Sequence, residues 1–127
     1  MENLIPKKVL VADDDPDTVL VLEQGLKHAG YIVATARDGE EALVRFKEFR
    51  PDLVILDVEM PRLTGWEVLE RIKSGWKSKR VPVMMLTARD SDDDKIRGYE
   101  HGVSFYVTKP FNLQKLLPVI RSLTRIE

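Results

Sequence analysis

The sequence predicts a doubly wound α/β domain built on a five-stranded parallel sheet. Short apolar runs, often β-branched and each bounded by turn or charge signals, are typical of strands that are buried on both faces. These runs span residues 9–12, 31–35, 53–56, 81–86 and 105–107. Segments with helical periodicity separate them. A strict alternation of strands with helices favours a parallel sheet with helices packed on both faces, because each crossover is right-handed.

Each helical segment opens with a residue that can cap a helix N-terminus. The expected caps, in chain order, are Asp15, Asp38, Thr64 and Ser91, the last with Asp94 three residues on, and the fifth helix begins near Asn112. Pro16 stands at the first position of the first helix, and Gly30 follows its last turn. Proline at the start and glycine just past the end are the usual helix boundaries.

The last two helical segments are less regular than the others. The fourth carries Ile96 and Tyr99, and the fifth carries Leu116 and Ile120 at helical spacing. Pro118 lies inside the fifth segment, where it removes a backbone donor and crowds the carbonyl four residues earlier. We therefore expect a kink or a late helix start there.

Length and composition indicate a single domain over residues 1–127, with its core at about 8–123. Of the 127 residues 43% are hydrophobic, and 20 Lys and Arg nearly balance 21 Asp and Glu, for a net charge of −1. This balance disfavours binding to nucleic acid or to a membrane surface through bulk charge. The chain has no cysteine, which excludes thiol nucleophiles and Cys-ligated metals. It also lacks a signal peptide and a membrane-length apolar run, so we expect a cytoplasmic protein.

Polar residues that can bind a metal and a phosphoryl group follow the predicted strands. Asp13 and Asp14 come after the first strand and Asp57 after the third, while Thr87 ends the fourth and Lys109 follows the fifth. The carboxyl ends of parallel strands meet at one edge, where two carboxylates about 5 Å apart repel by roughly 3 kcal/mol. A hard divalent cation such as Mg²⁺ relieves that repulsion. A lysine and a hydroxyl beside it suit a phosphoryl group, and with no cysteine the acceptor would be a carboxylate.

Taken singly, each of these residues has an ordinary structural explanation. Asp15 before Pro16 caps a helix, Asp57 could be a loop acid, and Lys109 could be a surface residue. Only their joint occurrence at the ends of four strands favours the functional interpretation.

The stretches VLVADDD, PDLVILDVEMP, VPVMMLTA and YVTKPF carry a resemblance to a known family. From about Lys8 to Leu123 the chain resembles the receiver domain of two-component response regulators, of the kind found in chemotaxis regulators. The resemblance implies a flavodoxin-like three-layer sandwich with strand order 2-1-3-4-5. It also implies that Asp57 is the phosphoacceptor and that Asp13, Asp14 and Asp57 bind Mg²⁺, or Mn²⁺ in its place, together with the backbone carbonyl of Glu59.

The same resemblance assigns the remaining site residues. Lys109 would contact the phosphoryl oxygens, and the Lys109–Pro110 peptide would be cis. Thr87 and Tyr106 match a switch pair, in which Thr87 moves to the phosphoryl group and the Tyr106 ring turns inward. Glu59 and Arg89 lie two residues beyond Asp57 and Thr87, where opposite charges could pair across the mouth of the site and lengthen the life of phospho-Asp57.

The implied function is regulatory. The domain would take a phosphoryl group from a sensor histidine kinase or a histidine phosphotransfer protein, and would signal to a downstream effector protein or domain. It would promote only its own phosphorylation and dephosphorylation, and would exist as a monomer or weak dimer. Ser104, Phe105 and Lys115 depart from the pattern of members that dimerise through the fourth helix, fifth strand and fifth helix, which argues against a salt-bridged dimer of that kind.

Several alternatives remain open at this point. A receiver-like module that works without phosphorylation is one, and an aspartate-nucleophile phosphatase is another, although such enzymes place the nucleophile after the first strand. A flavin-binding module on the same fold is disfavoured, because the aspartates after the first strand would repel a flavin phosphate. The basic stretch 73–80 with Trp76 could be a nucleic-acid patch, but a solvated loop is favoured because its footprint is small.

Overall fold

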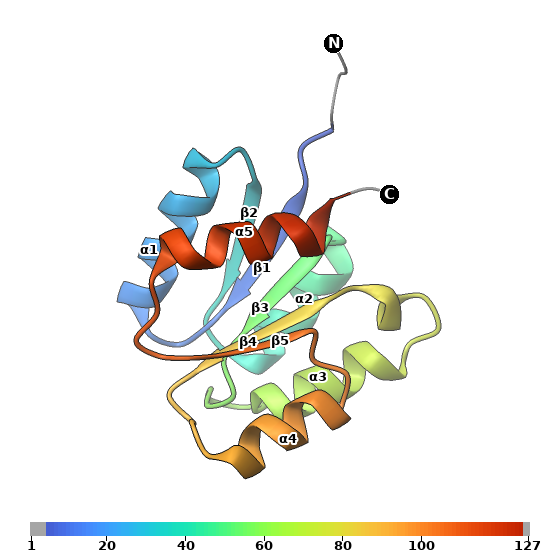
Figure 1. The fold of residues 1–127 in the computed structure, drawn as a ribbon. Helices are drawn as coiled ribbons and strands as arrows, with labels where there is room; N and C mark the ends of the chain where they lie inside the picture. Colours follow the sequence, from blue (N-terminus) through green and yellow to red (C-terminus); the bar gives the residue numbers. More distant parts are fainter. Residues whose placement is uncertain (1–4, 126–127) are drawn as a thin grey trace.

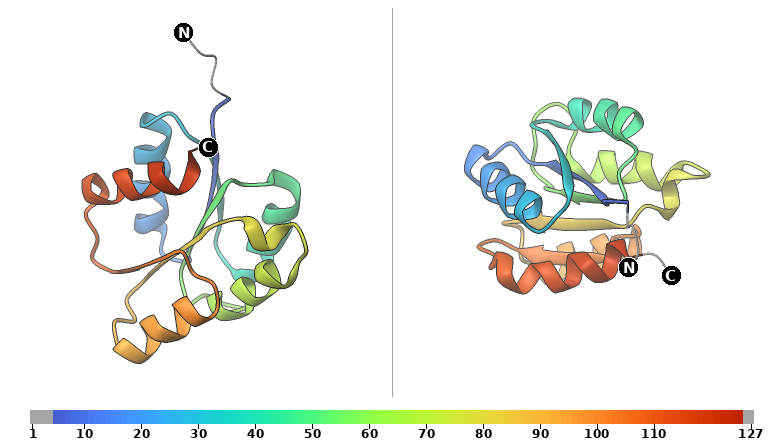
Figure 2. Two further views of the ribbon diagram at one scale, coloured as in Figure 1. Left: turned by 45° about the vertical axis from the view of Figure 1, so that its right-hand side comes forward. Right: turned by 90° about the horizontal axis from the view of Figure 1, so that it is seen from above.

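A computed structural model describes residues 5–125 and has the predicted architecture. The parallel sheet has five strands in the order β2-β1-β3-β4-β5, flanked by helices on both faces (Figures 1 and 2). The strands are β1 (Lys8–Ala12), β2 (Ile32–Ala36), β3 (Leu53–Leu56), β4 (Val83–Thr87) and β5 (Phe105–Thr108). The helices are α1 (Pro16–His28), α2 (Gly39–Phe49), α3 (Gly65–Ser74), α4 (Asp92–Glu100) and α5 (Leu113–Thr124), with a 3₁₀ turn η1 (Ser78–Arg80) before β4.

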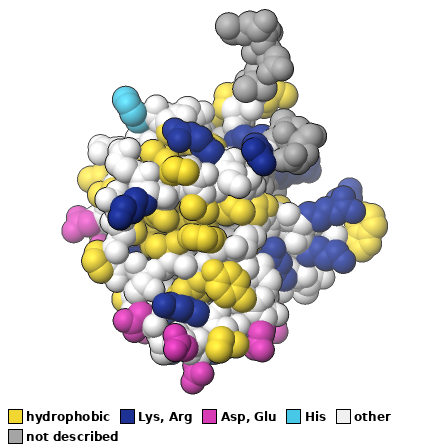
Figure 3. Space-filling view, viewed as in Figure 1, with side chains coloured by type: hydrophobic (Ala, Val, Ile, Leu, Met, Phe, Trp, Pro, Cys, Tyr) yellow, Lys and Arg dark blue, Asp and Glu magenta, His cyan; other side chains and the backbone are white. Residues whose placement is uncertain are grey.

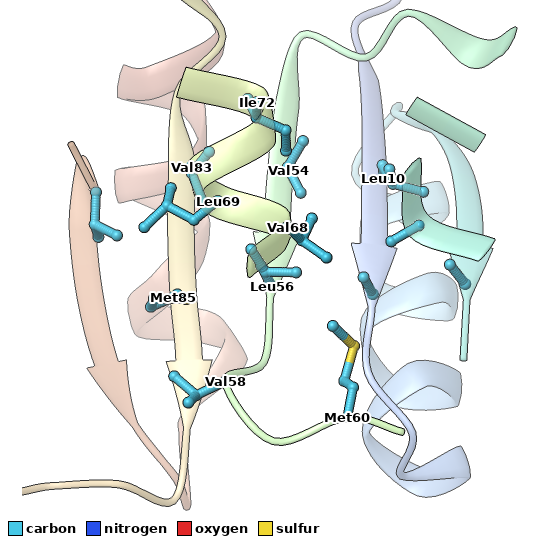
Figure 4. Close-up of a cluster of buried hydrophobic side chains, with 14 of the residues drawn as sticks. Leu10, Val54, Leu56, Val58, Met60, Val68, Leu69, Ile72, Val83 and Met85 are labelled. Atoms are coloured by element: carbon cyan, nitrogen blue, oxygen red, sulfur yellow. The ribbon is translucent and has the colours of Figure 1, made fainter. Parts of the chain in front are cut away.

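The sheet separates two hydrophobic layers. Because side chains alternate along a strand, Val9 and Val11 of β1 pack with α1 and α5, whereas Leu10 and Ala12 pack on the opposite face. On that opposite face α2 and α3 cover the sheet, and Figure 4 shows the side chains of α3 lying against β3 and β4. Central strands that are buried on both faces explain why their sequences read as continuous apolar runs.

The four predicted helix caps are confirmed, and the fifth helix begins directly after Asn112, as expected. The side chain of Asp15 accepts from the Asp17 amide, and Asp38 and Ser91 cap α2 and α4 in the same manner. Thr64 and Glu67 form a complete capping box at the start of α3. Asn112 caps α5. These caps fix where each helix leaves the carboxyl edge of the sheet, and so they fix the loops that carry the strand-end residues.

Strands β2 and β4 begin later than predicted because the backbone groups of the first predicted residues are used elsewhere. The amide of Tyr31 donates to the Leu26 carbonyl and closes α1, so β2 begins at Ile32. The amide of Val81 donates to the Ser78 carbonyl in η1, and Pro82 has no amide hydrogen, so β4 begins at Val83.

The expected late start of α5 is wrong. The helix begins at Leu113, directly after its cap, and continues past Pro118, which is exposed. Leu116 and Ile120 on either side of the proline are buried against the sheet, and this packing holds the helix together. A kink at Pro118 stays a prediction. Of the helices in the described chain, none is long and apolar enough to cross a membrane.

The residue of helix α4 that is buried against the rest of the domain is a glycine. Ile96 and Tyr99 are 55% and 50% exposed, and Gly98 is the buried residue of the helix. A Cβ atom at Gly98 would lie 2.9 Å from Cδ2 of Tyr106, closer than the two carbons can approach without a shift. The absence of a side chain at position 98 therefore makes room for the ring of Tyr106.

This contact predicts that Gly98→Ala destabilises the protein. In the interior of a helix the change from glycine to alanine normally adds up to about 1 kcal/mol of stability. Here we expect a loss, because the methyl group meets the Tyr106 ring. Combined with Tyr106→Ala, the same change should become stabilising. Urea unfolding of the four proteins of this double-mutant cycle measures both effects, and a gain in stability from Gly98→Ala alone would refute the packing argument.

Candidate functional site

The carboxyl ends of the central strands bring the predicted site residues together. Ala12 pairs with Leu56 in the β1–β3 ladder, so Asp13 and Asp57 emerge side by side from the buried sheet. Thr87 is the last residue of β4, and its carbonyl accepts from the amide of Lys109. Four residues distant in sequence thus meet at one edge, as the strand pattern predicts.

Lys109 connects the two buried carboxylates. Its Nζ lies 2.8 Å from Oδ2 of Asp13 and 3.3 Å from Oδ2 of Asp57. The Lys109–Pro110 peptide bond is cis, which confirms the conformation expected from the sequence. Two other strands separate β5 from β1. The Lys109 ammonium group therefore connects the end of β5 with acids that follow β1 and β3.

The electrostatics of this cluster are those of carboxylates held out of water. Asp13 is 2% exposed, and burial raises its pKa to about 6, with the charge of Asp57 acting in the same direction and the Lys109 hydrogen bond opposing it. Burial also disfavours the charge on Lys109, but the hydrogen bond to Asp13 and the charge of Asp57 outweigh it and raise the lysine pKa. The lysine therefore stays protonated while the acid pair still lacks full compensation.

Three carboxylates are arranged so that they could hold a cation. One oxygen each from Asp13, Asp14 and Asp57 lies within 4.8 Å of the others, with Asp14 exposed and the other two buried. An all-oxygen donor set that is open to solvent on one side fits a hard ion that keeps part of its water shell, as Mg²⁺ does. The residues present therefore fit the expected metal.

Asp15 does not join this cluster. Its carboxylate accepts from the Asp17 amide at 3.1 Å and from the Thr18 hydroxyl at 2.8 Å, and the Thr18 bond holds its pKa below the usual value. Its own amide donates to Oδ1 of Asp13 at 2.9 Å. Asp15 thus caps α1 and helps to orient Asp13. Its neighbours Asp13 and Asp14, by contrast, belong to the acidic cluster that could hold a cation.

The two residues expected to form a switch both contact the backbone of Arg89. The Thr87 hydroxyl oxygen accepts from the Arg89 amide at 3.3 Å, and the Tyr106 hydroxyl donates to the Arg89 carbonyl at 2.7 Å. Tyr106 is 8% exposed, and burial raises its pKa to about 12. The sequence interpretation had the ring turning inward on phosphorylation, whereas the structure describes a ring that already lies inward, in the space beside Gly98.

The side chain of Arg89 lies at the mouth of the site between two acids. It reaches Glu59 at 3.6 Å, the opposite-charge pair expected from the sequence, and Asp94 at 3.2 Å. The Ser91 hydrogen bond lowers the pKa of Asp94, which keeps that carboxylate ionised. Sequence reasoning identified Asp94 only through its spacing from the cap Ser91, and so missed its contact with Arg89.

A hollow of about 500 Å³ opens beside Asp14 and Glu59. Its far wall contains Trp66 of α3 and Arg97 of α4, whose guanidinium carbon lies 4.3 Å from the centroid of the indole ring. A cation–π contact of this kind ties α4 to α3. No sequence signal pairs these two residues, because the contact depends on how the two helices lie on the sheet.

The chain matches a known family over almost its whole length. The family model described as the response regulator receiver domain covers residues 9–121. The alkaline phosphatase synthesis transcriptional regulatory protein PhoP of Bacillus subtilis (strain 168) is 40% identical over 119 residues, which are 94% of this chain and 49% of PhoP. The transcriptional regulatory protein PrrA of Mycobacterium tuberculosis (strain ATCC 25618 / H37Rv) is 44% identical over 118 residues, 93% of this chain and 50% of PrrA.

Solved structures agree with this assignment. The chemotaxis protein CheY4 of Vibrio cholerae superposes with a TM-score of 0.87 at 35% identity, covering 94% of this chain and 99% of CheY4. A putative response regulator from Chloroflexus aurantiacus gives a TM-score of 0.88 at 36% identity, covering 94% and 98% of the two chains. The chain spans about half the length of the curated relatives it matches. From the strand order, the cluster at the carboxyl edge and these similarities, the chain belongs to the response regulator receiver domain family.

Proposed function

We propose that this domain accepts a phosphoryl group on Asp57 from a phosphohistidine of a sensor histidine kinase or histidine phosphotransfer protein. The observation that carries the proposal is the position of Asp57 itself. Its carboxylate is 6% exposed, and it lies beside two further carboxylates and within 3.3 Å of the Lys109 ammonium. A carboxylate between a cation site and a fixed lysine is placed to react with an incoming phosphoryl group.

Asp13, Asp14 and Asp57 would hold Mg²⁺, together with the backbone carbonyl of Glu59, and Mn²⁺ offers the same preference for oxygen ligands. When bound, the ion neutralises negative charge on the transferring group. Lys109 is the second positive charge at the site. Its ammonium, which contacts Asp13 and Asp57, would donate to a phosphoryl oxygen.

The transfer exchanges one bond for another. A carboxylate oxygen of Asp57 attacks phosphorus, a P–O bond forms, and the P–N bond of the phosphohistidine breaks with its electron pair returning to the imidazole. Two contacts orient the acceptor: the Glu59 amide donates to Oδ1 of Asp57 at 3.3 Å, and Lys109 donates to Oδ2 at 3.3 Å. These contacts restrict the rotation of the carboxylate and favour an in-line approach.

The signal would leave the site through Arg89. The phosphoryl group on Asp57 adds acceptor oxygens, and the Thr87 hydroxyl would turn from the Arg89 amide to donate to one of them. That movement frees the Arg89 amide, while the bond from Tyr106 to the Arg89 carbonyl holds the ring inward. Phosphorylation would thereby stabilise one arrangement of the β4–α4 loop and α4, which shifts the populations of existing conformations.

A downstream effector protein or domain would read this arrangement. The matched relatives PhoP and PrrA are named as transcriptional regulatory proteins, and this domain covers about half of each, so an output outside residues 1–127 is consistent with the proposal. The domain would be a regulatory phosphoacceptor that promotes only its own phosphorylation and dephosphorylation. A cytoplasmic location and a single domain over 1–127 remain our expectations.

Phosphoryl transfer predicts a mass change that depends on a single carboxylate. Incubated with Mg²⁺ and acetyl phosphate, the protein should gain the mass of one phosphoryl group, and Asp57→Asn should gain none because the amide is no nucleophile. Asp52→Asn removes a carboxylate at the opposite edge of the sheet and should react like the unmodified protein. Intact mass spectrometry gives the result. Equal labelling of Asp57→Asn would place the acceptor elsewhere, and no labelling of any protein would favour a phosphorylation-independent module.

The ion pair at the mouth of the site predicts the stability of the phosphorylated form. Glu59 and Arg89 should hinder the water that hydrolyses phospho-Asp57, so Glu59→Ala and Arg89→Ala should each shorten its half-life, by about threefold or more if each change removes about 0.7 kcal/mol of barrier. Arg45→Ala, which breaks an exposed pair with Glu41 far from the site, is the matched control. Loss of label is followed by mass spectrometry after acetyl phosphate is removed. Unchanged half-lives in both variants would show that the pair, which is 66% and 42% exposed, has no effect.

A further inference from the structure

A groove lined by positive charge lies at the opposite edge of the molecule from the phosphoacceptor. It runs between the C-terminal ends of α2 and α3 and the connection from α3 to β4, as two adjoining hollows of about 380 Å³ each. The two hollows share Phe46, Lys47 and Ser78. We call it the basic groove, and its main lining residues are Phe46, Lys47, Arg50, Arg71, Lys77 and Val81.

One wall of the basic groove is held in place by internal hydrogen bonds. The Nζ of Lys73 donates to the carbonyls of Lys79 at 3.2 Å and Val81 at 2.8 Å, and the Ser78 hydroxyl donates to the Ile72 carbonyl at 2.6 Å. Burial lowers the pKa of Lys73, as expected for an ammonium group used to build the loop. A fixed wall loses little conformational freedom when another molecule docks.

The cations of the basic groove lack acidic partners. Among residues 5–125, none of Lys47, Arg50, Arg71 and Lys77 forms an ion pair. Lys47 and Arg71 lie in the last turns of α2 and α3, where a positive charge compensates the helix dipole. Arg50 and Lys77 lie past the last helical residues, so dipole compensation is a weaker explanation for them.

A complementary surface lies on α4 of the same chain. Asp92 and Asp93 are exposed and, within the described chain, form no ion pair, and Ile96 follows one turn later with 55% of its surface exposed. Spacings of three and four residues place these side chains and Glu100 on neighbouring positions of one helix face. Lys95 lies on the same face, which therefore keeps a net negative charge. Figure 3 shows acidic side chains around apolar ones at the lower edge of the molecule, where α4 lies, and basic side chains at the right edge, where the α3–β4 connection lies.

We propose that the basic groove docks α4 of a second copy of this chain, so that the copies associate head to tail. Asp92 and Asp93 would meet Arg50 and Lys77, and Ile96 would enter the apolar floor of the groove. The overall charge of −1 imposes little net repulsion between copies, so the opposed patches can attract. Since two different surfaces meet, each complex keeps one free groove and one free α4, and association can continue beyond a dimer.

Other anionic occupants fit the basic groove less well. A nucleic acid backbone needs a track of cations along its length, whereas these cations surround apolar hollows. A membrane surface is met by apolar side chains that protrude. Trp76 of the α3–β4 connection does protrude, with 75% of its surface exposed, but it does not line the groove, whose apolar residues Phe46 and Val81 border a hollow. An exposed helix that carries acids and an aliphatic side chain matches both the charge and the shape of the groove.

Sedimentation velocity of the whole chain tests the proposal. At about 20 mM NaCl the average sedimentation coefficient should rise with protein concentration, and at about 300 mM NaCl the association should weaken by about tenfold or more, because salt screens the charges. The same runs use a groove-reversed protein, Arg50→Glu with Lys77→Glu, and a helix-reversed protein, Asp92→Lys with Asp93→Lys. Each reversed protein alone should stay monomeric.

The decisive experiment measures the sedimentation of a mixture of the two charge-reversed proteins. A groove turned acidic faces a helix turned basic, so the mixture should associate although neither component does. Lys115→Glu with Arg121→Glu, an equal reversal on exposed positions of α5, should self-associate like the unmodified protein. Circular dichroism and urea unfolding check that every variant is folded.

Three results would overturn the proposal. The first is a sedimentation coefficient at low salt that is independent of concentration. The second is association that survives both reversals, which would place the contact elsewhere. The third is binding of a fluorescein-labelled oligothymidylate or of anionic lipid vesicles to the groove with no association between copies, which would identify a different occupant.

Discussion

The contact on which the site depends is the one between Lys109 and two carboxylates at the ends of buried strands. Asp13 and Asp57 continue β1 and β3 out of the hydrophobic layers, and both are almost fully removed from water. An uncompensated buried charge costs several kcal/mol, so these neighbouring acids require a cation. Lys109 supplies one from the end of β5, which lies two places from β3 and three from β1 in the sheet. Burial raises the pKa of Asp13 although Lys109 opposes the shift, so one ammonium group does not fully compensate this carboxylate, and a second cation is therefore expected here.

A second constraint connects this cluster to the surface. The amide of Arg89 donates to the Thr87 hydroxyl, and its carbonyl accepts from the Tyr106 hydroxyl. Its guanidinium lies between Glu59 and Asp94. A change at Asp57 that moves Thr87 therefore alters a hydrogen bond of the β4–α4 loop directly. Helix α4 is suited to respond, because Gly98, which packs against Tyr106, is its buried residue. Further contacts are made by exposed side chains: Arg97 lies over Trp66, and the Tyr99 hydroxyl accepts from the Tyr106 amide. Elements with few buried contacts rearrange at low cost.

The strand ends could be predicted from the sequence, and with them most of the site. Asp13, Asp57, Thr87 and Lys109 follow short apolar runs, and the topology of a parallel sheet alone brings such positions together. Helix caps such as Asp38 could equally be predicted from the sequence, because a capping hydrogen bond joins residues that are close together in the chain. The contacts of Arg89 with Asp94, and of Arg97 with Trp66, could not be predicted, because they join side chains through the packing of helices on the sheet. Periodicity likewise located α4 but could not show that Ile96 and Tyr99 are half exposed while Gly98 is buried.

The most direct test of the central contact compares Mg²⁺-dependent thermal unfolding of the unmodified protein with that of Lys109→Met. Without divalent ions the variant should be less stable by about 3 kcal/mol or more, because two buried carboxylates lose their cation. Added Mg²⁺ should then raise the unfolding temperature of Lys109→Met by more than that of the unmodified protein, since the ion takes over the missing positive charge. Equal stability of the two proteins without metal, or equal shifts on adding Mg²⁺, would contradict the account that the acid pair governs this site.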